Sequence, residues 1–81
     1  MHSHTVDRRQ LAIKLFAVYD SPFYAAELAE IFTNRLVRRR VAHGQRSRTV
    51  RPGAIRQWKH HGILPYYAAP IAIELLEAVN G

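Results

Sequence analysis

Apolar residues recur along most of the chain at intervals of three and four, the spacing of one face of an α-helix. The first such stretch covers roughly residues 7–19, where Leu11, Leu15 and Val18 fall on one stripe. Asp7, followed three residues later by a glutamine, is typical of the capping box that begins a helix. The pattern therefore predicts an amphipathic helix at the start of the chain.

A second helical pattern follows a short break in the chain. Ser21 is a good helix cap and Pro22 fits the first helical position, so this helix is predicted from 22 to at least 33. Residues 35–42 still carry some apolar periodicity. They either continue this helix or form a separate element.

Two further helices are predicted in the second half of the chain. One opens at Pro52 and stops before Gly62, and another opens at Pro70. The apolar stripe of the last helix consists of Ile71, Leu75 and Val79.

Residues 43–49, between the second and third predicted helices, have no apolar side chain to bury. Residues 43–49 are predicted as a basic loop, although 41–51 could also form a short hairpin. No other stretch predicts a strand. We expect an all-α fold of four to five helices, with a disordered tail at 1–4 and a single domain at 5–81.

Composition excludes several kinds of protein. The 81 residues contain no cysteine, which excludes disulfides and thiolate chemistry. No apolar run approaches the about 20 residues of a membrane span, and the first residues do not resemble a signal peptide. The sequence therefore predicts an intracellular protein that does not bind a membrane.

Charge is distributed very unevenly. The chain has a net charge of +6, yet nine of its 12 basic residues and none of its six acidic residues fall between positions 35 and 61. Such a concentration predicts a polyanion or an acidic protein as partner.

The helix predicted at 52–61 divides into two unlike sides. Ile55 and Trp58 lie three apart on one side. The opposite side carries Gly53, Arg56, Gln57 and His60. Arginine can bridge O6 and N7 of guanine, and glutamine can bridge N6 and N7 of adenine, so this side suits the reading of bases in a major groove. An ordinary solvated helix would show the same periodicity.

Residues 50–65 resemble the recognition-helix region of Cro-like phage repressors and their small bacterial relatives. The resemblance lies in the polar-Pro helix start at Arg51-Pro52, the aliphatic–aromatic pair three apart, and Gly62-Ile63-Leu64-Pro65. MerR-type regulators share part of this pattern. Residues 25–32 look like the first helix of the family's motif, with Ala29 at a small-residue contact position.

The resemblance implies a helix-turn-helix core and a transcriptional regulator of phage or bacterial type. Such a protein binds double-stranded DNA in the bacterial cytoplasm, at the nucleoid, usually as a two-fold homodimer. On the exposed side of helix 52–61 we expect Arg56, Gln57 and His60 to read bases, helped by Arg51 and Gly53 at the helix start.

One departure from the family pattern is large. Where the family has a tight turn, this chain has residues 33–49, the most basic part of the sequence. Either the second helix is prolonged and a long basic excursion replaces the turn, or residues 25–32 are not the partner helix.

The basic residues around this excursion are candidates for phosphate contacts, each of which steepens the salt dependence of DNA binding. They are Arg38, Arg39, Arg40, Arg46, Arg48 and Lys59. A solvated charged face is the ordinary alternative. Single-stranded RNA is a competing target, since arginine planes and Tyr66 and Tyr67 could stack bases. It ranks below DNA because the sequence shows no RNA-binding motif.

No pattern predicts catalysis, a metal site, a cofactor or a small-molecule substrate. The histidines lack cysteine or acidic neighbours at ligand spacing, and no nucleophile motif or phosphate-binding loop is present. The rival to DNA reading is a small basic interaction module that binds and inhibits an acidic host protein through 35–51.

Overall fold

The computed structural model describes residues 7–42 and 49–80, and within α2 it describes residues 40–42 by their backbone alone. The described residues contain four helices and no strand, which confirms the predicted all-α fold. The helices are α1 (Arg8–Val18), α2 (Tyr24–Ala42), α3 (Pro52–His61) and α4 (Ala69–Asn80). The tail predicted at 1–4 lies outside the described residues.

The start of α1 is capped as the sequence predicts. Asp7 has extended backbone dihedrals, and its carboxylate accepts hydrogen bonds from the backbone N–H groups of Arg9 and Gln10 at 3.0 and 3.1 Å. These two donors would otherwise lack partners in the first turn.

The start of α2 differs from the prediction by two residues. Ser21 and Pro22 lie in a turn, and the helix begins at Tyr24. The Ser21 hydroxyl accepts the N–H of Phe23 at 3.1 Å and donates to the carboxylate of Glu27 at 2.6 Å. Ser21 thus organises the entry to α2, while Pro22 shapes the turn rather than the first helical position.

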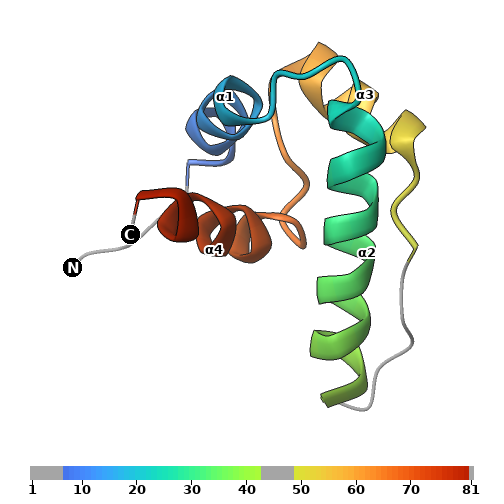
Figure 1. Cartoon of the computed structure of the whole chain (residues 1–81). Helices are drawn as coiled ribbons and strands as arrows, with labels where there is room; N and C mark the ends of the chain where they lie inside the picture. Colours follow the sequence, from blue (N-terminus) through green and yellow to red (C-terminus); the bar gives the residue numbers. More distant parts are fainter. Residues whose placement is uncertain (1–6, 43–48, 81) are drawn as a thin grey trace, which may run out of the picture.

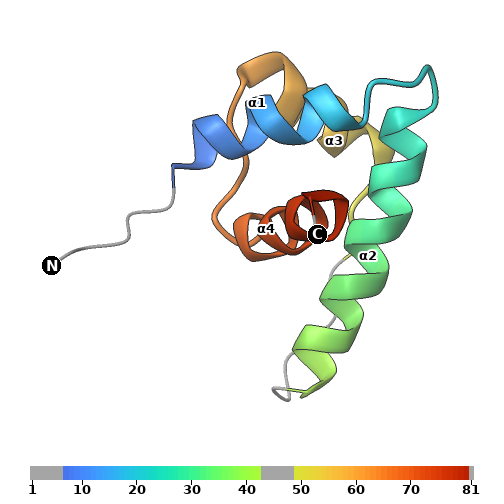
Figure 2. The same cartoon turned by 60° about the vertical axis from the view of Figure 1, so that its left-hand side comes forward.

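Helix α2 is continuous over 19 residues, about 28 Å, so residues 35–42 prolong it rather than form a separate element. In both Figure 1 and Figure 2 its last turns extend beyond α4. Residues 41 and 42 are helical, so the alternative of a hairpin over 41–51 is wrong at its first two residues. The loop predicted at 43–49 lies outside the described residues up to position 48.

The chain returns to α2 well before the end of that helix. The Thr33 hydroxyl accepts the N–H of Val50 at 2.8 Å and donates to the Val50 carbonyl at 3.1 Å. Thr33 lies nine residues before Ala42, about 14 Å along the helix. Of the two alternatives for 33–49, the structure shows the prolonged second helix, which runs on to Ala42, past the level at which the chain returns to it at Val50.

The end of α3 is a glycine-dependent stop. Gly62 has φ 69°, in the left-handed region that favours glycine, and its N–H donates to the Trp58 carbonyl at 2.9 Å. The connector that follows is fixed to the start of α1, because Leu64 N–H donates to the Arg8 carbonyl and the Arg8 guanidinium donates to the Leu64 carbonyl, both at 3.3 Å.

The helices pack as two contacting pairs, α1 against α4 and α2 against α3, and α1 also touches α3 (Figures 1 and 2). One apolar cluster lies between them. Its largest fully buried side chains are Leu15, Leu28, Phe32, Ile55, Leu64 and Ile71. Because α3 contributes to this single core, its orientation is fixed relative to the rest of the molecule.

Candidate nucleic-acid interface

The apolar side of α3 is anchored in the core as its spacing predicts. Ile55 is fully buried and Trp58 is 9% exposed. The indole packs edge-on against the rings of Phe32 and Tyr67, with centroids 5.4 and 6.2 Å away. Such aromatic contacts add to the burial energy and fix the rotation of the helix about its own axis.

The opposite side of α3 is exposed. Gly53, Arg56, Gln57 and His60 all face solvent, and so does Arg51 immediately before the helix. Within the described part of the chain, no hydrogen bond or ion pair occupies the side chains of Arg51, Arg56 or Gln57. The donors that the sequence predicts for base reading are therefore free to meet a ligand.

The start of α3 is open. Arg51 occupies the N-cap position with extended dihedrals and makes no side-chain cap, and Pro52 begins the helix. A Cβ placed on Gly53 would meet no atom within 4 Å. Backbone N–H groups at a helix start attract anions. Among the described residues the N–H of Gly53 is left for an anion here, because Pro52 has no N–H group and the N–H of Ala54 donates to the Arg51 carbonyl at 3.0 Å.

Lys59 points toward the beginning of α2. Its ammonium lies 4.2 Å from the centroid of the Tyr24 ring, a cation–π contact. The side chain is nevertheless exposed, so its charge remains available on the side of the molecule where α3 and α2 meet.

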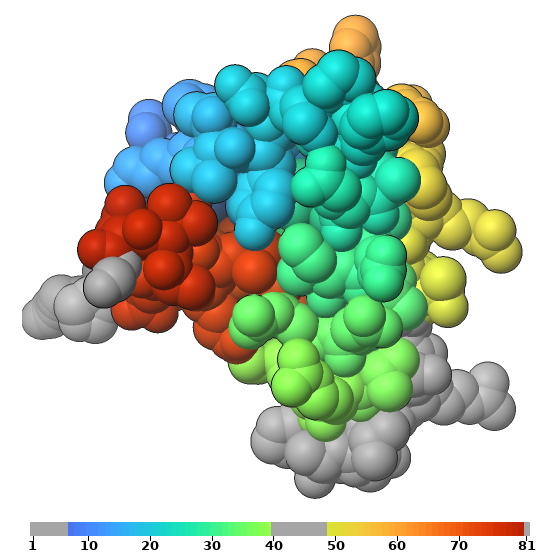
Figure 3. Space-filling view, in the orientation of Figure 1, coloured from blue at the N-terminus to red at the C-terminus, as the bar shows by residue number. Residues whose placement is uncertain are grey.

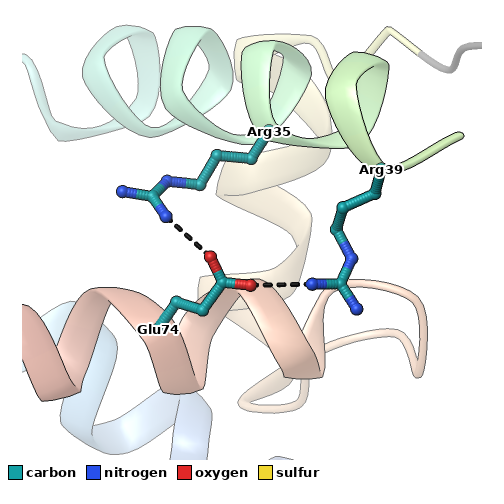
Figure 4. A network of polar contacts seen from close by, with 3 residues as sticks. All are labelled: Arg35, Arg39 and Glu74. Carbon is teal, nitrogen blue, oxygen red and sulfur yellow. Dashed lines mark hydrogen bonds and ion pairs between the residues drawn. The ribbon is translucent and has the colours of Figure 1, made fainter. Parts of the chain in front are cut away.

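The arginines of α2 do not form one uniform basic face. Arg35 and Arg39 each donate to one carboxylate oxygen of Glu74, at 2.7 Å in both cases, as Figure 4 shows. Arg38 is exposed and does not join this network. Of the other predicted phosphate contacts, Arg40 has no described side chain, and Arg46 and Arg48 lie outside the described residues.

The histidines of α3 lie side by side. The rings of His60 and His61 meet edge to face with centroids 5.3 Å apart. Among the described residues, no three histidine or acidic side chains gather as a metal site would require.

Three residues of the arrangement could not be found from the sequence. Glu74 is an acidic residue outside the basic stretch 35–61, yet it binds Arg39 and Arg35, which lie 35 and 39 positions away in the sequence. Thr33 likewise binds Val50 in the segment before α3, and Tyr24 contacts Lys59 of α3. No periodicity or motif signals contacts of this kind, because they depend on how α2 meets α3 and α4.

Comparison of the chain with protein-family models, with curated proteins and with solved structures finds no match. In the described ranges 7–42 and 49–80, none of the helices has both the length and the apolar character to cross a membrane.

Proposed function

We propose that this protein is a sequence-specific DNA-binding transcriptional regulator of phage or bacterial type, acting in the bacterial cytoplasm. The observation that carries the proposal is the exposed side of α3. It presents Arg56 and Gln57 without partners among the described residues, on a helix that Ile55 and Trp58 hold in the core. The Cro-like resemblance of residues 50–65 supports the same function.

In this proposal Arg56, Gln57 and His60 meet base edges in the major groove. Arg51 and the open helix start at Gly53 lie next to them and approach the backbone of the DNA. Each bidentate base contact contributes about 1–3 kcal/mol of discrimination between sites.

Phosphate contacts come from the basic residues around this face. Arg38 and Lys59 are exposed, and Arg39 keeps about half of its side chain exposed despite its ion pair. The trio of Arg35, Glu74 and Arg39 retains a net charge of +1, so it still attracts a phosphate. Arg40, Arg46 and Arg48 add charge nearby in sequence.

Like the family it resembles, the protein is proposed to act as a two-fold homodimer. Two copies would read half-sites about one helical turn apart on the same side of the DNA.

The test is a selection from a random duplex library at fixed salt, followed by affinity measurements on the enriched site and on a scrambled site. We expect an enriched motif that is bound about 10³-fold or more above the scrambled duplex. Failure of any motif to emerge, with equal affinity for all duplexes, would contradict the proposal.

One observation favours the rival function, a basic module that inhibits an acidic host protein. The last turns of α2 extend beyond the other helices, with Arg38 and Val37 exposed. If the selection yields no motif while a Glu- and Asp-rich host protein binds with an affinity that Arg38→Ala weakens, the rival replaces DNA reading.

A further inference from the structure

Two neighbouring residues of α2 hold α3 at two different points. Toward the end of α3, Trp58 packs edge-on against Phe32, with ring centroids 5.4 Å apart. Just before the start of α3, Val50 is bound by the hydroxyl of Thr33, the residue that follows Phe32. The first contact is apolar and lies in the core, whereas the second is polar and holds only the start of the helix.

Thr33 provides the partner for both backbone polar groups of Val50. Its hydroxyl accepts the Val50 N–H at 2.8 Å and donates to the Val50 carbonyl at 3.1 Å. Both bonds are partly buried, and Val50 itself is 4% exposed. Backbone groups removed from water need a partner within the protein, and a threonine hydroxyl offers a donor and an acceptor at one atom. These two bonds therefore fix the backbone of Val50 against α2.

The start of α3 has no side-chain cap of its own. Arg51 occupies the N-cap position without a side-chain hydrogen bond to the helix, and Pro52 follows it. A Ser, Thr, Asp or Asn at the N-cap usually fixes the first turn of a helix. Here the nearest side chain that binds the backbone at this end belongs to Thr33 on α2, and it acts one residue before the cap.

The bonds at Val50 also link the two groups of candidate DNA contacts. Arg51 follows Val50 directly, and Arg56 lies five residues further on. On α2, Arg38 lies five residues beyond Thr33, about 8 Å along the helix. In Figure 3 the yellow residues at the start of α3 lie along the green surface of α2, and their side chains project at the right-hand edge. A shift of this end of α3 would therefore move base-reading side chains relative to the charge on α2.

We propose that Thr33 is a positioning residue for DNA recognition, whose two bonds to Val50 hold the start of α3 where Arg51 and Arg56 reach the DNA. Thr33 is half-buried and acts through Val50, without touching the DNA itself. Binding side chains must be held within about 0.5 Å of their productive geometry, so a loosened helix start loses discrimination between sites. The inference rests on the proposed function and names a residue that sets its specificity.

The first test is amide hydrogen exchange of the free chain, which needs no DNA. Thr33→Val keeps the shape of the side chain and removes the hydroxyl. The Val50 amide should then exchange about tenfold faster or more, because its acceptor is lost. The Gly62 amide, which donates to the Trp58 carbonyl at the other end of α3, should keep its rate.

The second test is DNA binding, under conditions in which denaturation curves show each variant to be fully folded. Thr33→Val should lower the affinity ratio between the selected and the scrambled duplex about tenfold. Affinity for the scrambled duplex and the salt slope should stay as in the wild type, because every charge remains. A mere loss of folded protein would lower both affinities by the same factor. Thr33→Ser keeps the hydroxyl and should restore the ratio.

Two controls match the chemical change. Thr49→Val removes the hydroxyl of an exposed residue directly before Val50. Ser21→Ala removes a hydroxyl that, like that of Thr33, accepts a backbone N–H and donates to an oxygen, but at the entry to α2. Both variants should keep the Val50 exchange rate and the affinity ratio of the wild type.

Unchanged exchange at Val50 in Thr33→Val, or an equal acceleration at Gly62, would overturn the inference whether or not DNA is the ligand. An affinity ratio that Thr33→Val leaves intact, or that Thr49→Val lowers as much, would overturn it too. A wild-type chain that selects no motif contradicts the proposed function and, with it, the role of Thr33 in specificity. Local acceleration at Val50 would then show that the function failed rather than the placement of α3.

Discussion

Two basic regions of this protein use their charge in different ways. On α3, Arg56 lies on an exposed side and has no partner among the described residues. On α2, Arg35 and Arg39 both form ion pairs with the carboxylate of Glu74. Both regions look alike in the sequence, as arginines in a stretch without acids. The comparison teaches that part of the charge holds the fold together and part is available to a ligand.

The difference has a structural cause. Helix α3 turns its apolar side into the core through Ile55 and Trp58, so its polar side must face outward. The second half of α2 has less core to cover, with Leu36 buried and Val37 exposed. Ion pairs to α4 stabilise that half instead, and each is worth at most about 1 kcal/mol at such exposure.

The largest expected effect comes from removing the anchor of α3. Trp58→Ala should lower the free energy of unfolding by about 3–5 kcal/mol, because the indole fills space against Phe32 and Tyr67. Chemical denaturation measures this value. His61→Ala, an exposed change on the same helix, should shift it by less than about 0.5 kcal/mol. Similar losses for both variants would contradict the anchoring role.

The next effect sharpens the contrast between the two basic regions. Arg56→Ala and Gln57→Ala should each cost about 1–3 kcal/mol of discrimination at one or two positions of the selected DNA site. Stability should remain unchanged, because both side chains are exposed. Arg9→Ala and Gln10→Ala on α1 are matched exposed controls, and binding titrations on single-base variants of the site should find their discrimination intact.

Changes at the α2 network should act on all sequences alike. Arg39→Ala is expected to weaken every duplex and to reduce the salt slope by about one. Glu74→Gln should strengthen the binding of every duplex, because it releases Arg35 and Arg39 from their carboxylate. The same variant should lower the free energy of unfolding by about 1 kcal/mol or less. Affinities across a salt series measure both.

The control for the second of these variants is Glu30→Gln, which removes an exposed acid from α2 without freeing an arginine. It should strengthen non-specific binding less than Glu74→Gln does. Equal effects of Glu30→Gln and Glu74→Gln would mean that only net charge affects DNA binding and that the ion pairs with Glu74 do not keep Arg35 and Arg39 from the DNA.

The smallest effect separates stability from binding at the start of α3. Gly53→Ala meets no atom within 4 Å and should raise the free energy of unfolding by about 0.5–1 kcal/mol through the unfolded chain. If the DNA backbone approaches Gly53, the same variant should bind DNA more weakly. Thermal melts measure the stability of Gly53→Ala, and binding titrations of the same preparation measure its DNA affinity. A rise in both quantities would contradict a close approach of the DNA backbone to Gly53.

Much of the fold was predictable because local chemistry decides it. The cap at Asp7, the stop at Gly62 and the buried Ile55–Trp58 pair follow from spacing and residue type. The continuity of α2 to Ala42 was not decided by the sequence, since polar residues with weak apolar periodicity suit a helix or a loop equally.

The candidate site was predictable only in part, for the same physical reason. Exposure of Arg56 and Gln57 follows from the helical period once Ile55 and Trp58 are assigned to the core. Pairing of Arg39 with Glu74 does not follow, because it joins residues 35 positions apart through the packing of two helices. The exposed end of the α1 stripe at Val18 also needed the structure, since periodicity alone places it with the core residue Leu15.

The central claim is that Arg56 reads a base, and base substitution in the selected DNA tests it most directly. Replacing each guanine in turn by 7-deazaguanine removes the N7 acceptor and leaves the pairing of the strands unchanged. The wild-type chain should lose about 1 kcal/mol or more at one guanine of each half-site. Arg56→Ala should be insensitive to the substitution there, while Arg9→Ala should respond as the wild type does. An Arg56→Ala variant that is as sensitive as the wild type at every guanine would contradict the account.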